Sequence, residues 1–281
     1  MGLRKGHLNS EIEDILKGSF DLHVHASPDT TERRMDALET ARSAYESKMS
    51  GFVLKAHDYP TSPLAYVLNR MYPGLEVVGA IALSRSVGGI NPDAVRVSAE
   101  LGAKVVWMPT ITANHWNKAH GGGQGLRITD DRGKLLEKTI EVIEVVYEYE
   151  MVLASGHVSP KEVITLFKEA EARGVTRMIA THPQSDATED EVLEIASSGA
   201  YLEYPFVSCM PSHGNMSPSE LAKKIRLHGI ERCIITTGLG QWVNPPPAEG
   251  MRMAIATMLN SGMSTDEIST LVKKNPRQLI D

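Results

Sequence analysis

Short apolar runs of strand length recur along the chain, and amphipathic segments separate them. Eight runs rich in Val, Ile, Leu and Ala cover residues 19–25, 51–57, 75–81, 104–109, 151–155, 177–182, 200–204 and 232–237. Apolar runs of this length, bounded by polar or glycine residues, predict buried β-strands.

The segments between these runs have the apolar spacing of helices. In residues 134–150, for example, Leu135, Ile140, Ile143 and Val146 recur at helical intervals. Several segments begin with a capping residue followed by proline and end at glycine, as helices commonly do. The pattern predicts helices over residues 32–48, 92–101, 134–150, 160–173, 188–197, 218–228, 248–259 and 265–273.

Eight strands that alternate with helices predict parallel βαβ units, and eight such units close a (β/α)₈ TIM barrel of the α/β class. The 281 residues suit this fold, which needs about 250. We expect a short N-terminal helical extension over residues 1–18 and a single barrel domain over residues 19–281. The long glycine-rich loop at residues 110–133 follows the fourth strand, so we expect it to cover an active site.

Composition and charge exclude several classes of partner. The net charge is −6 with no basic run, which argues against nucleic-acid binding. No apolar stretch approaches 18 residues, which argues against a membrane partner. Cys209 and Cys233 lack CxxC spacing and the N-terminus lacks an apolar signal core, so we expect free thiols and a cytoplasmic location. The expected partner is a small-molecule substrate, and homo-oligomerisation stays open.

Histidines gather at one end of the predicted strands. His23 and His25 are two residues apart, so their side chains share a face of the first strand. His57, His157 and His182 also stand at carboxyl ends of strands, which is where barrels of this kind carry their active sites. Five of the ten histidines have this position, and none lies at an amino end. Clustered imidazoles predict a metal site, with zinc as the favoured ion.

In strand order, these histidines resemble the amidohydrolase superfamily. Its pattern is HxH on strand one, Lys or Glu on strand four, His on strands five and six, and Asp on strand eight. The resemblance implies one or two divalent ions, most simply zinc, held by His23, His25, His157 and His182. The closing residues 275–279 are similar to the end of superfamily members, and segments 51–57, 156–160 and 240–247 resemble a poorly characterised amidohydrolase-like family.

Two positions depart from that pattern. Residues 105–110 of strand four offer no bridging Lys or Glu. Lys55 on strand two is the lysine placed to serve instead, as a carbamylated bridging ligand or as a group that orients a substrate anion. His57 is a ligand or a supporting residue. On strand eight, Gly238 occupies the position of the expected aspartate, and Glu203 on strand seven is the nearest carboxylate. The catalytic candidates are therefore Lys55, His57, Glu203 and the Gly238 position.

The resemblance implies a metal-dependent hydrolase that cleaves an amide, lactone or other ester bond of a small molecule by metal-activated water. A metal-dependent decarboxylase of the same superfamily is an alternative. A second alternative is a binding barrel without catalysis, which the missing aspartate at Gly238 would explain. A phosphoesterase of the polymerase-and-histidinol-phosphatase type is a more distant reading, because it requires more strand-end ligands than the sequence offers.

Overall fold

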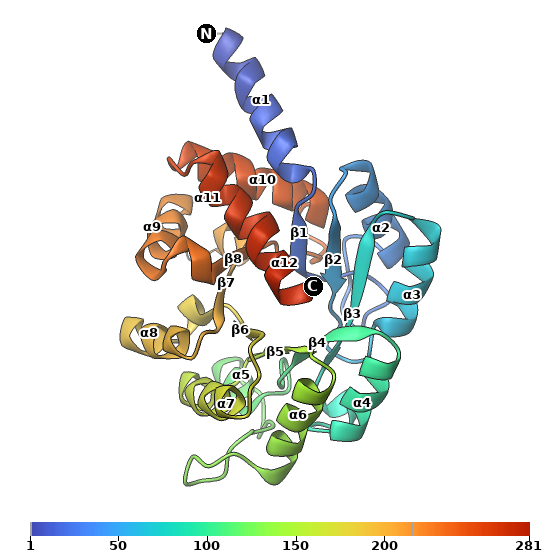
Figure 1. Cartoon of the computed structure of the whole chain (residues 1–281), viewed down its shortest axis with the longest axis vertical. Helices are drawn as coiled ribbons and strands as arrows, with labels where there is room; N and C mark the ends of the chain where they lie inside the picture. Colours follow the sequence, from blue (N-terminus) through green and yellow to red (C-terminus); the bar gives the residue numbers. More distant parts are fainter. Residues whose placement is uncertain (1, 215) are drawn as a thin grey trace.

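Eight parallel strands form the centre of the fold, and each overlaps one of the predicted apolar runs (Figure 1). The structure is a computed structural model that describes residues 2–214 and 216–281. The strands lie in chain order in one sheet, which confirms the predicted (β/α)₈ barrel. They are β1 (Phe20–Val24), β2 (Gly51–Leu54), β3 (Glu76–Ala82), β4 (Ala103–Trp107), β5 (Val152–Ala154), β6 (Met178–Ala180), β7 (Tyr201–Pro205) and β8 (Cys233–Thr236).

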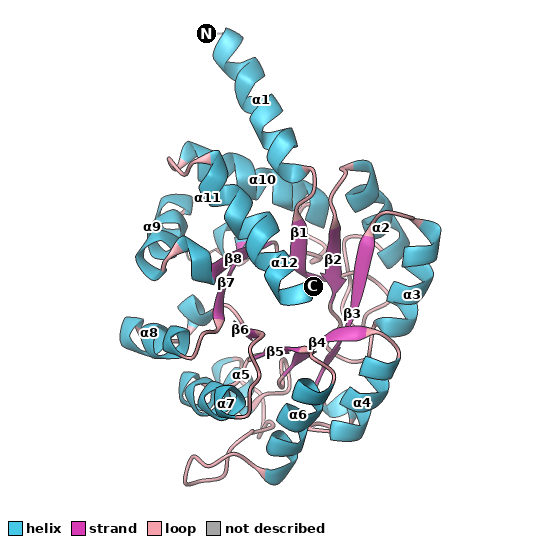
Figure 2. Cartoon of the chain, viewed as in Figure 1, coloured by secondary structure: helices cyan, strands magenta, loops and turns pink. Residues whose placement is uncertain are grey.

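Helices surround the strands on the outside of the barrel (Figure 2). They are α1 (Gly2–Leu16), α2 (Ala37–Glu46), α3 (Ser62–Met71), α4 (Pro92–Glu100), α5 (Asn114–Ala119), α6 (Glu137–Glu148), α7 (Pro160–Ala172), α8 (Glu189–Ser197), α9 (Pro218–His228), α10 (Pro247–Asn260), α11 (Thr265–Ser269) and α12 (Asn275–Ile280). The expected N-terminal helix corresponds to α1, which points away from the barrel (Figure 1). None of the helices in the described part of the chain is long and apolar enough to span a membrane.

Four helical segments differ from the predicted pattern, one of which is α5, within the predicted loop at residues 110–133. The pattern does not predict α3, because its buried positions are Ser62, Ala65 and Leu68 and only one of these is large. The helix predicted over 32–48 begins only at residue 37, where Asp36 forms a capping box. The last predicted helix, 265–273, consists of α11 and a π-helical turn over Thr270–Lys274, and α12 follows beyond the predicted end.

The barrel interior is filled and its amino end is closed. Inward side chains such as Leu22, Val105 and Ile234 form one buried cluster along the barrel axis. Leu279 and Ile280 of α12 belong to this cluster, so the last helix covers the amino end of the barrel. Access to the strands is therefore from their carboxyl ends, where the histidines stand.

Contacts between β1 and the segment after β8 close the barrel. The His25 amide donates to the Leu239 carbonyl at 2.8 Å, and the Gly238 amide donates to the His23 carbonyl at 3.0 Å. Val24 and Leu239 form a parallel bridge at the same place. These bonds all lie at the carboxyl end of β1, so the closure of the barrel directly positions the HxH pair.

Candidate active site

The five strand-end histidines converge on one cavity of about 350 Å³ at the carboxyl mouth of the barrel. Side chains from the loop after β4 also line it, among them Ile111 and Trp116, so this loop contributes to the wall of the cavity as expected. The Trp116 ring centroid lies 4.6 Å from that of His157. The cavity is also lined by Arg33, Ser208 and Gly238.

The five imidazoles form a closed ring around the cavity floor. Successive ring centroids are 5.1 Å apart for His23 and His25, 4.8 Å for His25 and His57, and 6.0 Å for His57 and His157. The circuit closes at 5.0 Å from His157 to His182 and 6.2 Å from His182 to His23. Residues from β1, β2 and the segments after β5 and β6 are thus brought together as the sequence predicts.

Burial keeps these imidazoles uncharged. It lowers the pKa of all five histidines, that of His182 to about 4 and that of His57 to about 2. The nearby cationic side chains of Lys55 and Arg33 lower the pKa of His57 further. Neutral imidazole is the form that binds metal ions, so at neutral pH the cluster offers ring nitrogens with free lone pairs.

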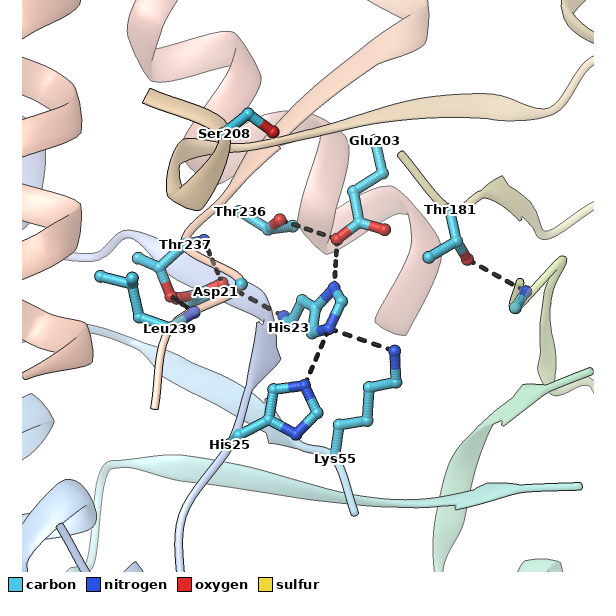
Figure 3. A network of polar contacts seen from close by, with 12 residues as sticks. Asp21, His23, His25, Lys55, Thr181, Glu203, Ser208, Thr236, Thr237 and Leu239 are labelled. Atoms are coloured by element: carbon cyan, nitrogen blue, oxygen red, sulfur yellow. Dashed lines mark hydrogen bonds and ion pairs between the residues drawn. The ribbon is translucent and has the colours of Figure 1, made fainter. Parts of the chain in front are cut away.

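A carboxylate behind His23 fixes the orientation of its ring (Figure 3). His23 Nδ1 lies 2.6 Å from Glu203 Oε1, which also accepts a hydrogen bond from the Thr236 hydroxyl at 2.7 Å. Burial raises the pKa of the Glu203 carboxyl, but the adjacent His23, His182 and Lys55 together outweigh this effect and the pKa falls to about 2. Glu203 is therefore ionised and holds the proton on Nδ1, which leaves Nε2 free toward His25.

His23 Nε2 is the point where the buried polar groups meet (Figure 3). It lies 3.1 Å from His25 Nε2 and 3.1 Å from Lys55 Nζ. Lys55 is 1% exposed, and burial lowers its pKa to about 7. Of the residues described, neither Lys55 nor Glu203 lines the cavity, so both act on His23 from beneath.

Gly238 lines the cavity, and its backbone explains why glycine stands there. Its φ is +62°, in the left-handed region that side chains disfavour. A Cβ at this position would lie 3.0 Å from Pro205 Cβ and 3.0 Å from Val207 Cγ1. The missing aspartate therefore does not leave a vacant place that a carboxylate would fill without strain.

Sequence reasoning does not identify Asp21, which is fully buried at the seam between β1 and β8. Its Oδ1 accepts hydrogen bonds from the amides of His23 at 3.1 Å and Thr237 at 3.0 Å, and its Oδ2 accepts one from the Thr237 hydroxyl at 2.5 Å. The signal in the sequence is a lone carboxylate within an apolar run. Asp21 links the two edge strands just below the HxH pair.

The same carboxylate supports a β-bulge in β1. Asp21 pairs with Phe52, but Val24 pairs with Leu54, so β1 holds one residue more than β2 over this interval. The extra residue lets two successive side chains face inward. Leu22 joins the interior cluster, and His23 contacts Glu203 and Lys55.

His182 and His57 have further local supports. His182 has φ +34° and ψ 57°, a left-handed conformation that is uncommon for a residue with a side chain and that often marks functional sites. His57 Nδ1 lies 2.8 Å from the Thr110 hydroxyl at the start of the loop after β4. The backbone of His182 and the contact of His57 with the loop after β4 therefore constrain these two side chains.

The site suits a metal ion in its donor chemistry. Within the described part of the chain, the buried atoms His25 Nδ1, His157 Nδ1 and Glu203 Oε2 have no hydrogen-bond partner, and such atoms need an explanation. The pair of Nε2 atoms on His23 and His25 offers two nitrogen donors side by side. Across residues 2–214 and 216–281, however, no three His, Cys, Asp or Glu side chains already surround a common metal position.

Comparisons with known proteins agree with this fold. A model of a family of unknown function (DUF6282) matches residues 18–203. The structure is similar to that of the probable dipeptidase PvdM from Pseudomonas aeruginosa, with a TM-score of 0.69, 12% identity and 97% of each chain covered. It is also similar to the phosphotriesterase homology protein from Escherichia coli, with a TM-score of 0.69, 13% identity, and 94% of this chain and 99% of that chain covered.

The organophosphorus hydrolase from Deinococcus radiodurans gives a TM-score of 0.62 at 12% identity, with 94% of this chain and 92% of that chain covered. No curated protein matches the chain in sequence. At these identities the likeness establishes the fold, and it confirms that the barrel resembles those of amidohydrolase-like proteins.

Proposed function

The chain belongs to this family of unknown function, and we propose that it is a metal-dependent hydrolase of the amidohydrolase type. The bond cleaved is an amide, a lactone or another ester of a small molecule. The observation that carries the proposal is the ring of five neutral imidazoles at the mouth of the barrel, two of them buried and three half-buried. The fold supports it, because similar barrels include proteins named as a dipeptidase, an amidohydrolase and an organophosphorus hydrolase.

His23, His25, His157 and His182 would hold one or two divalent ions, of which zinc suits imidazole donors best. A bound metal supplies Lewis-acid activation of water and of the scissile carbonyl. Because a third ligand is not in place beside His23 and His25, metal binding would have to draw in His157 or His182. The positions of these two side chains on the same ring make them the nearest candidates.

The other buried polar groups prepare His23 for this role. Glu203 accepts a hydrogen bond from His23 Nδ1 and so fixes the ring, as carboxylates commonly do behind metal-binding histidines. Lys55 lies against Nε2 of the same ring and takes up buried space beside the HxH pair. Among the described residues, Glu203 contacts His23 Nδ1 and does not line the cavity, so its part is to position His23.

Metal content and product analysis test the proposal together. The purified chain is stripped with a chelator, loaded with Zn²⁺ and assayed against amide, lactone and ester panels in ¹⁸O-water. We expect zinc to bind and ¹⁸O to enter the acid product. His23→Ala should lose zinc, whereas His115→Ala should keep it, because His115 lies outside the ring and pairs with Asp186 at 3.6 Å.

Three outcomes would contradict the proposal. Carbon dioxide release from acid substrates without ¹⁸O incorporation would identify a decarboxylase. Zinc binding without turnover of any panel member would favour a binding barrel. Full zinc content in both His23→Ala and His182→Ala would show that the ligand assignment is wrong. Circular dichroism of each variant separates loss of metal from loss of fold.

A further inference from the structure

Arg33 stands at the wall of the histidine cavity, on the segment that follows β1. The Arg34 amide donates to the Gly240 carbonyl at 2.8 Å, and Arg33 forms an antiparallel bridge with Gln241. These contacts fix the backbone of this segment against the loop after β8. The Arg33 residue is only 8% exposed, and it lines the same cavity as His25 and His57.

One edge of the Arg33 guanidinium is already held in place. Its Nε and Nη2 lie 2.9 Å and 2.8 Å from the same oxygen, Asp29 Oδ2. The other oxygen, Asp29 Oδ1, accepts the Thr31 amide at 2.9 Å. Among residues 2–214 and 216–281, no partner is found for Arg33 Nη1. The guanidinium is thus pre-oriented by a buried carboxylate and keeps donors to spare.

The charge of the cavity is one-sided. Among the described residues that line it, Arg33 is the only Lys, Arg, Asp or Glu side chain. Asp29 lies behind Arg33 and does not line the cavity. An anionic group that entered would therefore meet a fixed guanidinium and no carboxylate, which is the arrangement that proteins use for carboxylates and phosphates.

We propose that the substrate carries a negatively charged carboxylate or phosphate group, and that Arg33 binds this group and determines specificity. The proposal rests on the proposed function, because it assigns the substrate class of the same site. The apolar side chains of Ile111, Trp116 and Val207 provide a wall for the body of such a molecule. A cavity of about 350 Å³ restricts it to a small acid or a small phosphate ester.

Matched esters test the assignment. 4-Nitrophenyl hydrogen glutarate and 4-nitrophenyl pentanoate have acyl chains of the same length and differ in a terminal carboxylate. The zinc-loaded chain should have the higher kcat/KM for the glutarate ester. In Arg33→Gln the ratio of the two kcat/KM values should fall by about 10- to 100-fold, the usual loss when a hydrogen bond to a charged group is removed. Competition by free glutarate and by inorganic phosphate distinguishes a carboxylate subsite from a phosphate subsite.

Two further variants separate this effect from general damage. Arg34→Gln removes the neighbouring charge, but Arg34 is exposed and lies over the Trp242 ring at 5.5 Å, so the ratio should not change. Asp29→Asn combined with Arg33→Gln avoids an unpaired buried carboxylate and should still lose the preference. An unchanged ratio in this folded double variant would overturn the role of Arg33.

The assignment of Arg33 remains testable if no ester is cleaved, an outcome that would refute only the hydrolase. In that case, calorimetry measures binding of glutarate and of phosphate to the intact chain and to the double variant. Weaker binding to the double variant supports the anion subsite without any turnover. Equal binding to both proteins, or no binding to the intact chain, contradicts it.

Discussion

Mild acid should destabilise the metal-free protein, because the histidine ring is neutral in the folded chain. The pKa of each of the five imidazoles lies below its ordinary value in the folded chain, mainly through burial. In the unfolded chain these groups take up protons near pH 6.5. The unfolded state therefore binds more protons below this pH, and stability is lost as the pH falls.

The size of the effect follows from linkage. Between pH 7.5 and pH 5.5, each histidine that stays neutral in the folded chain costs about 1.4 kcal/mol, or about 5 to 6 kcal/mol for His25, His57, His157 and His182 together. Burial raises the pKa of Asp21 to about 7, so Asp21 takes up a proton in the folded state and offsets about 2 kcal/mol of this loss. The pKa of Lys55 is lowered from 10.5 to about 7, which costs stability mainly as the pH falls from about 10.5 to 7.5, above this window. The net loss of about 3 to 4 kcal/mol is a large part of the whole stability of many domains.

Urea unfolding of the chelator-treated protein at pH 7.5, 6.5 and 5.5 measures this loss. A double variant, His57→Asn with His157→Asn, should lose about half of this histidine contribution, because two of the four imidazoles that carry it are removed. His115→Asn is the control: it lies outside the ring, so the pH dependence should not change. A free energy of unfolding that is constant from pH 7.5 to pH 5.5 would refute the reasoning, because it would mean that the ring is not buried in neutral form.

Three further predictions concern single side chains around the site. Because Trp116 lines the cavity, Trp116→Ala should raise KM about 10-fold while the free energy of unfolding changes by less than ~1 kcal/mol. The control is Trp242→Ala, which should change neither quantity because Trp242 is 52% exposed. Equal KM values for the two variants would reject a role for Trp116. Gly238→Ala should lower the free energy of unfolding in urea by about 2 kcal/mol, because of the positive φ and the two 3.0 Å contacts of the added Cβ. Gly133→Ala should lower it by only about 1 kcal/mol, because Gly133 has φ +80° but open space around it. Equal losses for the two variants would contradict the packing argument. Asp21→Ala should destabilise by about 2–4 kcal/mol and lower zinc content, because two buried amides lose their acceptor; full stability with full zinc would reject its role at the seam.

The barrel and the meeting of the histidines could be predicted from local patterns. Each strand is a buried apolar run, and parallel strands in a closed barrel place all their carboxyl ends at one mouth. His157 and His182 are 25 positions apart in the chain, yet their ring centroids lie 5.0 Å apart because β5 and β6 are neighbours. The order of the strands was sufficient to predict that these histidines meet.

The parts that could not be predicted depend on backbone detail and depth of burial. The sequence gives no sign that Gly238 has a left-handed backbone with neighbours at 3.0 Å, so an absent aspartate looks like a vacancy. It also does not place Lys55 and Glu203 beneath the imidazoles, out of the cavity. Arg33 is far from any strand end in the pattern, and only the fold of its segment brings it to the cavity wall.

The bulge in β1 shows why simple alternation is insufficient for the HxH pair. Alternation places Asp21, His23 and His25 on one face and Leu22 on the other. In the structure Leu22 is in the interior cluster, and His23 is inside the barrel mouth as well. The bulge therefore adds one residue to β1, and backbone amides that do not pair with a neighbouring strand need another acceptor. The Asp21 carboxylate accepts the amide of His23 and that of Thr237, which directly follows the last strand. One buried carboxylate thus satisfies the bulge, joins the first strand to the last, and determines where the first candidate ligand points.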